Sequence, residues 1–125
     1  MASFVFMPIA AIETLGTSEA KIGRTDSVDI VANDEGDSLS AGLFVPDEIE
    51  VKKKTTITWT NTDPLLRHTV TEGSELLTSE GHIPLFDSGP IAADGGTYSH
   101  TFSKKGEFYY YCNIHPFITG EIVVK

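Results

Sequence analysis

The sequence predicts an all-β domain, an antiparallel β-sandwich or barrel built from about eight short strands. Two observations lead to this class. Runs rich in β-branched and aromatic residues recur after residue 25, and Gly, Pro, Asn and Asp separate them at regular intervals. Helical periodicity is weak over the same region. At 125 residues, the chain is long enough for one domain with a single core.

Each of these runs predicts one strand. Alternation is clearest at 55–60, where Ile57 and Trp59 face the same way. Pro46 interrupts the second run, which we therefore expect at a sheet edge or a bulge. The stretch 72–84 is loop-like and has room for one helical turn. The expected strands cover residues 28–32, 43–51, 55–60, 68–71, 86–91, 97–102, 107–112 and 120–124.

Residues 1–25 are expected to form an arm or an extra strand ahead of the domain at 26–125. Residues 4–12 are mostly apolar, but no Lys or Arg precedes them and Pro8 interrupts them, so they make a poor signal peptide. A signal peptide is therefore absent or already removed. We expect the arm to cover a sheet edge or a neighbouring subunit, which allows a homo-oligomer. No apolar run reaches ~18 residues, so no transmembrane span is expected.

The chain is strongly acidic, with a formal net charge of −9 and a sequence pI of about 4.7. Nucleic acid is an unsuitable partner, because phosphate binding needs a basic patch. Lys52, Lys53 and Lys54 form the only basic cluster, which is typical of lysines that guard a sheet edge. The acidic surface would steer a basic partner toward the protein.

The most informative stretch contains the only cysteine, Cys112, with His115 three residues after it. A single cysteine excludes an intrachain disulfide, so its thiol is a buried apolar group, a nucleophile or a metal ligand. Alternation places Cys112 on the strand face of Phe108 and Tyr110, which we take as the core side. His68 is expected to begin an earlier strand, immediately after a turn. One thiolate and two imidazoles are the ligands of a trigonal copper site with a weak or absent axial ligand.

Other readings of these residues remain open. Zinc could use the same Cys-His-His set with an open fourth position. A Cys/His nucleophilic pair would need a third orienting group, and none is evident. Copper is favoured because Cu(II) heads the affinity series. Of the remaining histidines, His100 shares a strand face with core residues and is expected to be structural, whereas His82 lies in a polar loop and is expected to be solvated.

From about Val28 to the C-terminus, the chain resembles the cupredoxins, the small type 1 copper proteins, especially their plastocyanin-, halocyanin- and amicyanin-like members. The resemblance implies an eight-stranded Greek-key β-sandwich in which His68, Cys112 and His115 hold one copper ion. It covers most of the chain, with its motifs in the expected order. These motifs are Trp59-Thr60-Asn61, His68-Thr69-Val70, Phe86-Asp87-Ser88-Gly89, Tyr98-Ser99-His100-Thr101-Phe102 and, strongest, Gly106-Glu107-Phe108-Tyr109-Tyr110-Tyr111-Cys112-Asn113-Ile114-His115-Pro116.

The chain departs from this family at the axial position. The family places a methionine three residues after the second histidine, where this chain has Ile118, and its only methionines are Met1 and Met7. Three arrangements are open. Copper is three-coordinate beneath Ile118, which raises its reduction potential. A water or small molecule takes the axial position, as in the open-site red and purple cupredoxins, nitrosocyanin and the archaeal purple cupredoxin among them. Or Met7 or Glu13 of the arm reaches in.

The resemblance also implies hydrogen bonds to the cysteine sulfur. The backbone N–H of Thr69 is expected to donate to it. Ile114 stands where relatives often have proline, so its N–H is available for a second bond. Such bonds withdraw charge from sulfur and favour reduced copper.

By this resemblance, the expected function is one-electron transfer between Cu(I) and Cu(II), and the edge of the His115 ring is the exit route. A small apolar patch would suit brief docking with a basic redox partner. The predicted patch consists of Pro64, Leu65, Leu66, Pro116 and Phe117.

Two alternatives to electron transfer remain open. An open axial position would let the copper bind and convert a small molecule such as nitric oxide or nitrite. A copper carrier or store is a further alternative, but a preorganised site argues against it because delivery needs exchangeable ligands. Copper traffic and the resemblance favour an extracytoplasmic location, periplasmic or at the cell surface.

Overall fold

A computed structural model describes residues 25–32 and 42–125 of this chain. The arm expected at 1–25 lies outside the described residues, except for Thr25, which begins the first strand. Met7 and Glu13, the arm residues considered as axial ligands, are also outside this range. None of the helices in the described part of the chain has the length and apolar character of a membrane span.

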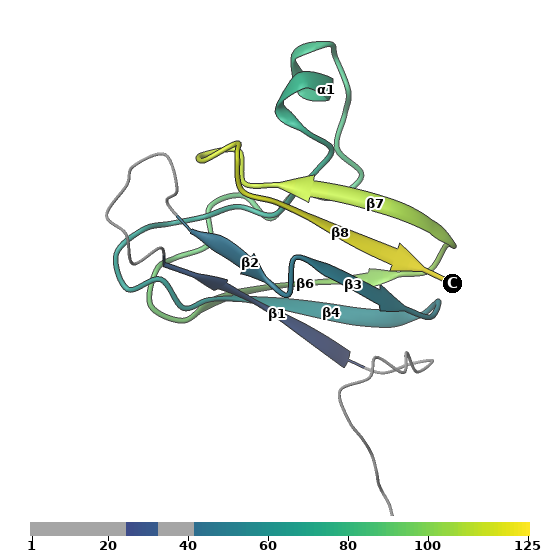
Figure 1. Ribbon diagram of the computed structural model, residues 1–125, viewed down its shortest axis with the longest axis horizontal. Helices are drawn as coiled ribbons and strands as arrows, with labels where there is room; N and C mark the ends of the chain where they lie inside the picture. Colours follow the sequence, from purple (N-terminus) through teal and green to yellow (C-terminus); the bar gives the residue numbers. More distant parts are fainter. Residues whose placement is uncertain (1–24, 33–41) are drawn as a thin grey trace, which may run out of the picture.

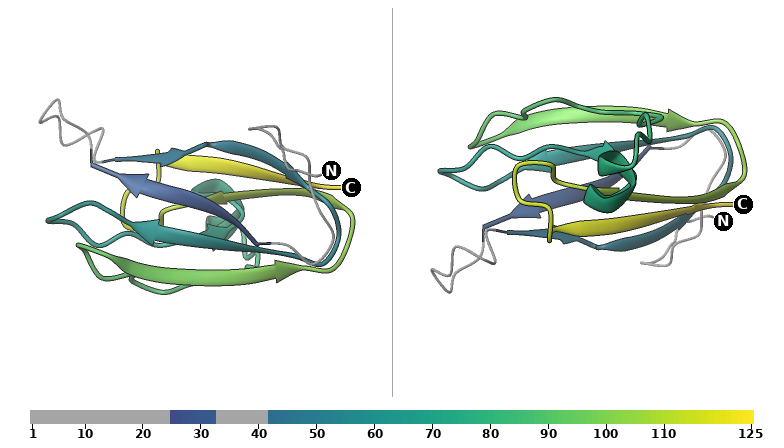
Figure 2. Two further views of the ribbon diagram at one scale, coloured as in Figure 1. Left: turned by 90° about the horizontal axis from the view of Figure 1, so that it is seen from below. Right: turned by 90° about the horizontal axis from the view of Figure 1, so that it is seen from above.

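Eight strands form two four-stranded sheets that face each other as a sandwich, as Figure 1 shows. One sheet has the order β2-β1-β4-β6 and the other the order β3-β8-β7-β5. The short helix α1 lies on the outward side of the second sheet (Figure 1, Figure 2). The element bounds are β1 Thr25–Val31, β2 Leu43–Val45, β3 Glu48–Val51, β4 Thr55–Asn61, β5 Thr71–Glu72, α1 Glu75–Ser79, β6 Gly96–Phe102, β7 Gly106–Tyr111 and β8 Thr119–Val124.

The predicted β-sandwich is confirmed, but its sheets are mixed rather than purely antiparallel. β1 pairs with β4, and β3 pairs with β8, in parallel register. The β1–β2, β4–β6, β5–β7 and β7–β8 pairs are antiparallel. Parallel neighbours need a long crossover, which sequence periodicity does not reveal. Here β2 and β3 supply one, because the chain changes sheets between β1 and β4.

Three expected strands differ from the prediction. The run at 86–91 forms no regular strand and makes only isolated bridges, of Asp87 with Thr71 and of Ile91 with His68. The run at 43–51 is two strands in different sheets, β2 and β3, and Pro46 lies at the crossing between them. The run expected at 68–71 makes regular pairs only at Thr71–Glu72, while His68 forms a single bridge with Ile91. The segment carrying His68 therefore lies at the end of the sandwich, where it is tied to a loop and not to a full strand.

Aromatic side chains fill the core between the sheets. Trp59 is completely buried, and its ring meets that of Tyr110 edge-on at a centroid distance of 5.4 Å. Ile57 and Trp59 both face inward, as their alternation predicted. Tyr110 passes close over β8, where a Cβ on Gly120 would overlap its ring. Cys112 belongs to the same buried cluster, so its thiol lies at the edge of the core.

Candidate metal centre

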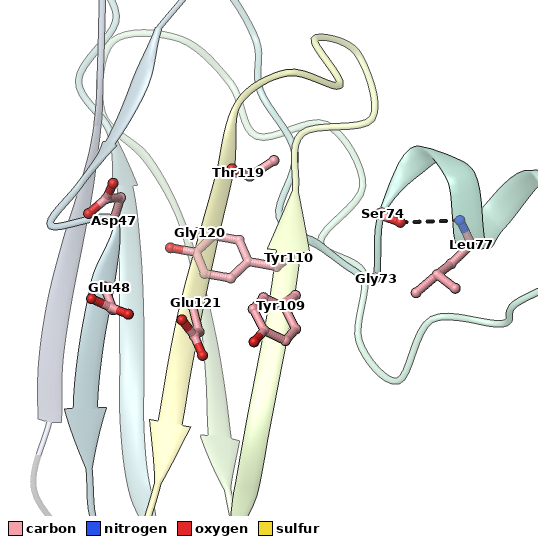
Figure 3. Close-up of a pocket in the computed structure, with 10 residues that line it drawn as sticks. All are labelled: Asp47, Glu48, Gly73, Ser74, Leu77, Tyr109, Tyr110, Thr119, Gly120 and Glu121. Carbon is pink, nitrogen blue, oxygen red and sulfur yellow. Dashed lines mark hydrogen bonds between the residues drawn. The ribbon is translucent and has the colours of Figure 1, made fainter.

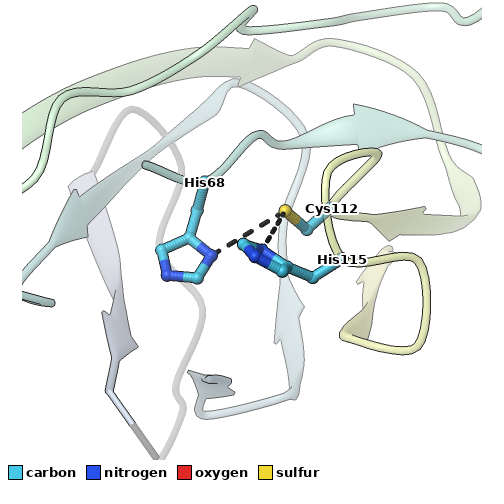
Figure 4. Close-up of side chains that lie close together, drawn as sticks. All are labelled: His68, Cys112 and His115. Atoms are coloured by element: carbon cyan, nitrogen blue, oxygen red, sulfur yellow. Dashed lines mark hydrogen bonds between the residues drawn. The ribbon is translucent and has the colours of Figure 1, made fainter. Parts of the chain in front are cut away.

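Three side chains from two separate segments converge at one end of the sandwich (Figure 4). His68 precedes β5, Cys112 directly follows β7, and His115 lies in the loop that leads to β8. Cys112 Sγ is 3.8 Å from Nδ1 of His68 and 3.6 Å from Nδ1 of His115. Each residue offers one ligand atom, and these atoms lie within 4.8 Å of one another. Within residues 25–32 and 42–125, no other such cluster of His, Cys, Asp or Glu occurs.

The loop from Cys112 to Ile118 is closed by its own backbone hydrogen bonds. The His115 N–H donates to the Cys112 carbonyl at 3.1 Å, and the Ile118 N–H donates to the His115 carbonyl at 2.9 Å. The Cys112 N–H in turn donates to the Ile118 carbonyl at 3.0 Å. These bonds hold Cys112 and His115 on one side of a tight loop before any metal arrives.

Side-chain hydrogen bonds join this loop to the segment of His68. The hydroxyl oxygen of Thr69 accepts from the Asn113 N–H at 2.8 Å and lies 3.0 Å from the hydroxyl of Thr71. Thr71 accepts from the Asn113 amide at 3.3 Å and donates to Asp87 at 3.0 Å. Because these groups are buried or partly buried, their bonds fix the distance between the two ligand segments.

The cysteine sulfur accepts hydrogen bonds from the backbone. The Thr69 N–H lies 3.3 Å from Cys112 Sγ, in the position that the resemblance implied. The Ile114 expectation is not met, because no hydrogen bond between its N–H and the sulfur is present among the described residues. The turn at Cys112 instead brings the His115 N–H near the thiol, where it helps to lower the pKa of Cys112.

One residue of the site, Asp63, was not identified from the sequence. Its Oδ2 lies 2.9 Å from Nε2 of His68, and the two side chains are almost fully buried. The other carboxylate oxygen accepts the N–H groups of Leu65 and Leu66 at 2.9 and 3.1 Å. An acidic residue in a turn shortly before a predicted histidine ligand was the signal that could have found it.

These contacts shift the protonation of the metal-free site. Burial raises the pKa of Cys112, but hydrogen bonds from His68, Thr69 and His115 outweigh it and bring the pKa to about 6. Burial lowers the pKa of His68, yet its bonds to Cys112 and Asp63 leave that pKa raised. Burial likewise raises the pKa of Asp63, and hydrogen bonds outweigh this, so the pKa lies below its ordinary value. A thiolate is thus available at neutral pH, as metal binding requires.

The donor set fits a single copper ion. A thiolate with imidazole nitrogens suits copper in softness and geometry. Because a carboxylate can only accept, the Asp63 contact places the proton of neutral His68 on Nε2 and leaves Nδ1 as the donor atom. The 3.6 and 3.8 Å separations from sulfur are shorter than two metal–ligand bonds of about 2.0–2.3 Å each, so one ion can reach both nitrogens and the sulfur.

Ile118 is buried, with 3% of its surface exposed. It lines a groove of about 450 Å³ together with Gly42, Leu43 and Phe117. None of the three ligand residues lines this groove. The Ile118 side chain thus borders the groove and belongs to the same buried cluster as Cys112.

The predicted docking residues lie on the loops beside the ligands. Leu65 is 84% exposed and Phe117 49% exposed, while His115 is half-buried. The rings of His115 and Phe117 have their centroids 6.5 Å apart. Pro64 and Leu66 are also exposed, and Pro116 is half-buried.

The two remaining histidines differ from each other. His100 is half-buried beside the core, with its ring centroid 4.6 Å from Phe86 and 4.7 Å from Phe102, as expected of a structural residue. The expectation of a solvated His82 is met only in part: 31% of its side chain is exposed, and its Nε2 lies 2.7 Å from the Glu72 carboxylate. Glu72 is the last residue of β5, and its contact with His82 holds the loop that carries His82 against the sheet. Sequence spacing does not indicate this contact.

A larger groove of about 540 Å³ lies on the outer face of the second sheet, beneath α1 (Figure 3). Carboxylates and Tyr109 line its floor, and Leu77 of α1 lines its wall. None of the three clustered ligands contributes to it. The metal cluster at the end of the sandwich is thus not part of either groove.

Comparison with known proteins agrees with this donor set. A family model of copper binding proteins, the plastocyanin/azurin family, matches residues 27–125. Amicyanin-alpha of Methylorubrum extorquens is 29% identical over 82 residues, 66% of this chain and 64% of that protein. Amicyanin of Paracoccus denitrificans is 35% identical over 78 residues, 62% of this chain and 55% of that protein. The chain thus spans less than two thirds of the length of either relative.

Solved structures show the same architecture. A purple cupredoxin from Nitrosopumilus maritimus superposes with a TM-score of 0.64 at 32% identity, covering 80% of this chain and 99% of that one. An oxidized amicyanin mutant superposes with a TM-score of 0.59 at 27% identity, covering 80% of this chain and 81% of that one.

Proposed function

The chain belongs to the plastocyanin/azurin family of copper-binding proteins, and on this premise we propose that it carries single electrons on one copper ion held by His68, Cys112 and His115. The observation that carries this proposal is the convergence of one thiol and two imidazole nitrogens in a cluster that the backbone already closes. A buried, preassembled site suits electron transfer better than copper delivery, which needs exchangeable ligands.

Bound copper would supply the change between two oxidation states, and the protein would keep its ligands still during that change. The hydrogen-bonded loop from Cys112 to Ile118 restricts movement of two ligands, and Thr69 ties the third to that loop. The Thr69 N–H withdraws charge from the sulfur, which favours the reduced state. Half-buried His115 offers the shortest route from the cluster to a partner.

The partner that we propose is a redox protein with a basic docking surface. Leu65 and Phe117 expose apolar area beside the ligands, and the rest of a chain with a net charge of −9 would attract positive charge. Small apolar contacts suit brief redox encounters. Replacing Phe117 with Glu should slow electron exchange and leave the copper spectrum unchanged, so equal exchange rates would contradict a docking role for Phe117.

The second candidate is a copper site that binds and converts a small molecule such as nitric oxide or nitrite at the axial position. It is favoured by Ile118, which has no atom that binds a metal, and by the groove that ends on it. Against it, Ile118 is buried, and none of the three ligands lines the groove. Electron transfer is therefore the preferred function.

Visible absorption and electron paramagnetic resonance after loading with Cu(II), with and without azide, test the two candidates. An intense band with narrow hyperfine splitting that azide leaves unchanged supports electron transfer at a site screened by Ile118. A spectrum that azide shifts would favour small-molecule chemistry. Ile118→Gly is the matched variant, because it opens the groove toward the ligands and should make a closed site sensitive to azide. Failure to bind Cu(II) would contradict both candidates.

We also propose an extracytoplasmic location, as copper traffic favours. The support is the family to which the chain belongs. Fractionation of the producing cells, followed by immunodetection, tests it directly.

A further inference from the structure

We propose that Asp63 is a positioning residue for the copper site, because it holds His68 with Nδ1 toward Cys112. Its buried negative charge also keeps the reduction potential of the copper lower than the three ligands alone would set it. This inference rests on the proposed function, since it concerns the potential of the copper held there. It adds a residue that neither the cysteine–histidine motif nor the axial position includes.

The Asp63–His68 contact defines the orientation of the ring. Oδ2 of Asp63 lies 2.9 Å from Nε2 of His68, while Nδ1 of His68 lies 3.8 Å from Cys112 Sγ. Neither side chain has more than 3% of its surface exposed. Gly42 lies close to the same edge of the ring, where a Cβ would come 3.2 Å from Cε1 and 3.5 Å from Nε2 of His68. The carboxylate contact and the close approach of Gly42 therefore restrict rotation of the imidazole.

Asp63 is itself fixed by four hydrogen bonds of its own. Oδ1 accepts the N–H groups of Leu65 and Leu66 at 2.9 and 3.1 Å. The Asp63 N–H donates to Asn61 Oδ1 at 3.0 Å, and its carbonyl accepts from the Asp94 N–H at 2.8 Å. A carboxylate anchored in this way presents Oδ2 to His68 with little further loss of side-chain conformational entropy.

The negative charge of Asp63 also affects the reduction potential of the copper, apart from its role in orienting the His68 ring. The oxidised site carries one more positive charge than the reduced site, so a fixed negative charge stabilises the oxidised state more. Burial makes this effect stronger, because solvent screens a buried charge poorly. The Thr69 N–H bond to sulfur and the isoleucine at 118, where the family has its axial methionine, both act in the opposite direction. Asp63 would therefore offset part of their effect on the potential.

The chain contains a matched control for this charge. Glu72 is also mostly buried, and its Oε1 lies 2.7 Å from Nε2 of His82, but that histidine is not in the metal cluster. Replacing either carboxylate by its amide removes one charge and keeps an oxygen that can accept from the imidazole. Only the change at Asp63 should alter the reduction potential of the copper.

The experiment compares Asp63→Asn and Glu72→Gln with the unaltered protein after copper loading. Voltammetry should show a higher midpoint potential for Asp63→Asn and an unchanged one for Glu72→Gln, while both keep the visible spectrum of the unaltered protein. An unchanged potential in Asp63→Asn, or equal shifts in the two variants, would overturn the charge effect.

A second measurement needs neither a variant nor copper. Long-range proton–nitrogen NMR spectra of the unaltered, metal-free protein should show His68 protonated at Nε2, with slow exchange of that proton. A bare Nε2 would overturn the positioning role. If this proton is present but the protein takes up no copper, the proposed function fails while the role of Asp63 in holding the ring stands.

Discussion

Two carboxylate–histidine pairs in this molecule look alike and serve different ends. Asp63 meets His68 at 2.9 Å, and Glu72 meets His82 at 2.7 Å, in both cases through Nε2. Each ring also lies close to a glycine, His68 against Gly42 and His82 against Gly73, and a Cβ on Gly73 would come 2.9 Å from the His82 ring. At the level of the pair itself, the two arrangements are nearly the same.

Burial and the neighbouring thiol separate the two pairs. His68 is fully buried and turns Nδ1 toward Cys112, whereas 31% of the His82 side chain is exposed. Glu72 also accepts the Leu85 N–H at 2.9 Å, so this second pair fastens the loop that carries α1 onto β5. A carboxylate fixes a histidine ring in both places, and the third partner decides whether the result is a metal ligand or a structural clamp.

The largest expected difference between the pairs is in copper binding. His68→Ala removes a ligand, and we expect the affinity for Cu(II) to fall by more than about 100-fold, because even residues that only support ligands cost about 10–100-fold. His82→Ala should bind copper like the unaltered protein. Titration followed by visible absorption measures both. Equal affinity of the two variants would remove His68 from the site.

The second-largest expected difference between the pairs is in their effect on the pKa of the Cys112 thiol in the metal-free protein. Cys112 should titrate with a pKa of about 6, so the thiolate predominates at neutral pH. His68→Ala removes the main stabilising hydrogen bond and should move the midpoint toward the ordinary value of 9.0. His82→Ala should leave the midpoint where it is. The ultraviolet absorbance of the thiolate, followed as a function of pH, reports the midpoint.

Removing the clamp should affect stability and not the metal. Glu72→Ala leaves the Leu85 N–H and His82 without their acceptor, and we expect the free energy of unfolding to fall by about 1–3 kcal/mol. Denaturant unfolding of the metal-free protein gives this value, and proteolysis should begin in the loop around α1. Copper affinity should be retained, and its loss would show that the two pairs are linked.

The smallest expected effect concerns His100, a histidine that packs against aromatic rings in place of a carboxylate. Burial lowers its pKa below the ordinary value of 6.5. The unfolded chain therefore binds a proton at a higher pH than the folded chain does, and stability declines as the pH falls from 6.5 through the folded pKa. His100→Phe should unfold with a weaker pH dependence in this window. An identical dependence would mean that other groups control acid sensitivity.

Local patterns were enough to predict much of this protein. Alternation at Ile57 and Trp59 identified a central strand and its inward face. The spacing of Cys112 and His115, together with His68, indicated three side chains that the fold brings together. These predictions succeeded because each depends on residues close in sequence, or on a motif whose members share one chemical requirement.

Other features required the folded chain, because they join residues through space. The parallel pairing of β1 with β4 depends on the crossing of β2 and β3 between sheets. The bond from Asp63 to His68 needs the turn to be folded, and the Glu72–His82 pair needs the α1 loop to return to the sheet. The sequence by itself determined most of the strands and the three candidate metal donors. Tertiary structure decided their partners, since burial and hydrogen-bond geometry exist only once distant segments have packed together.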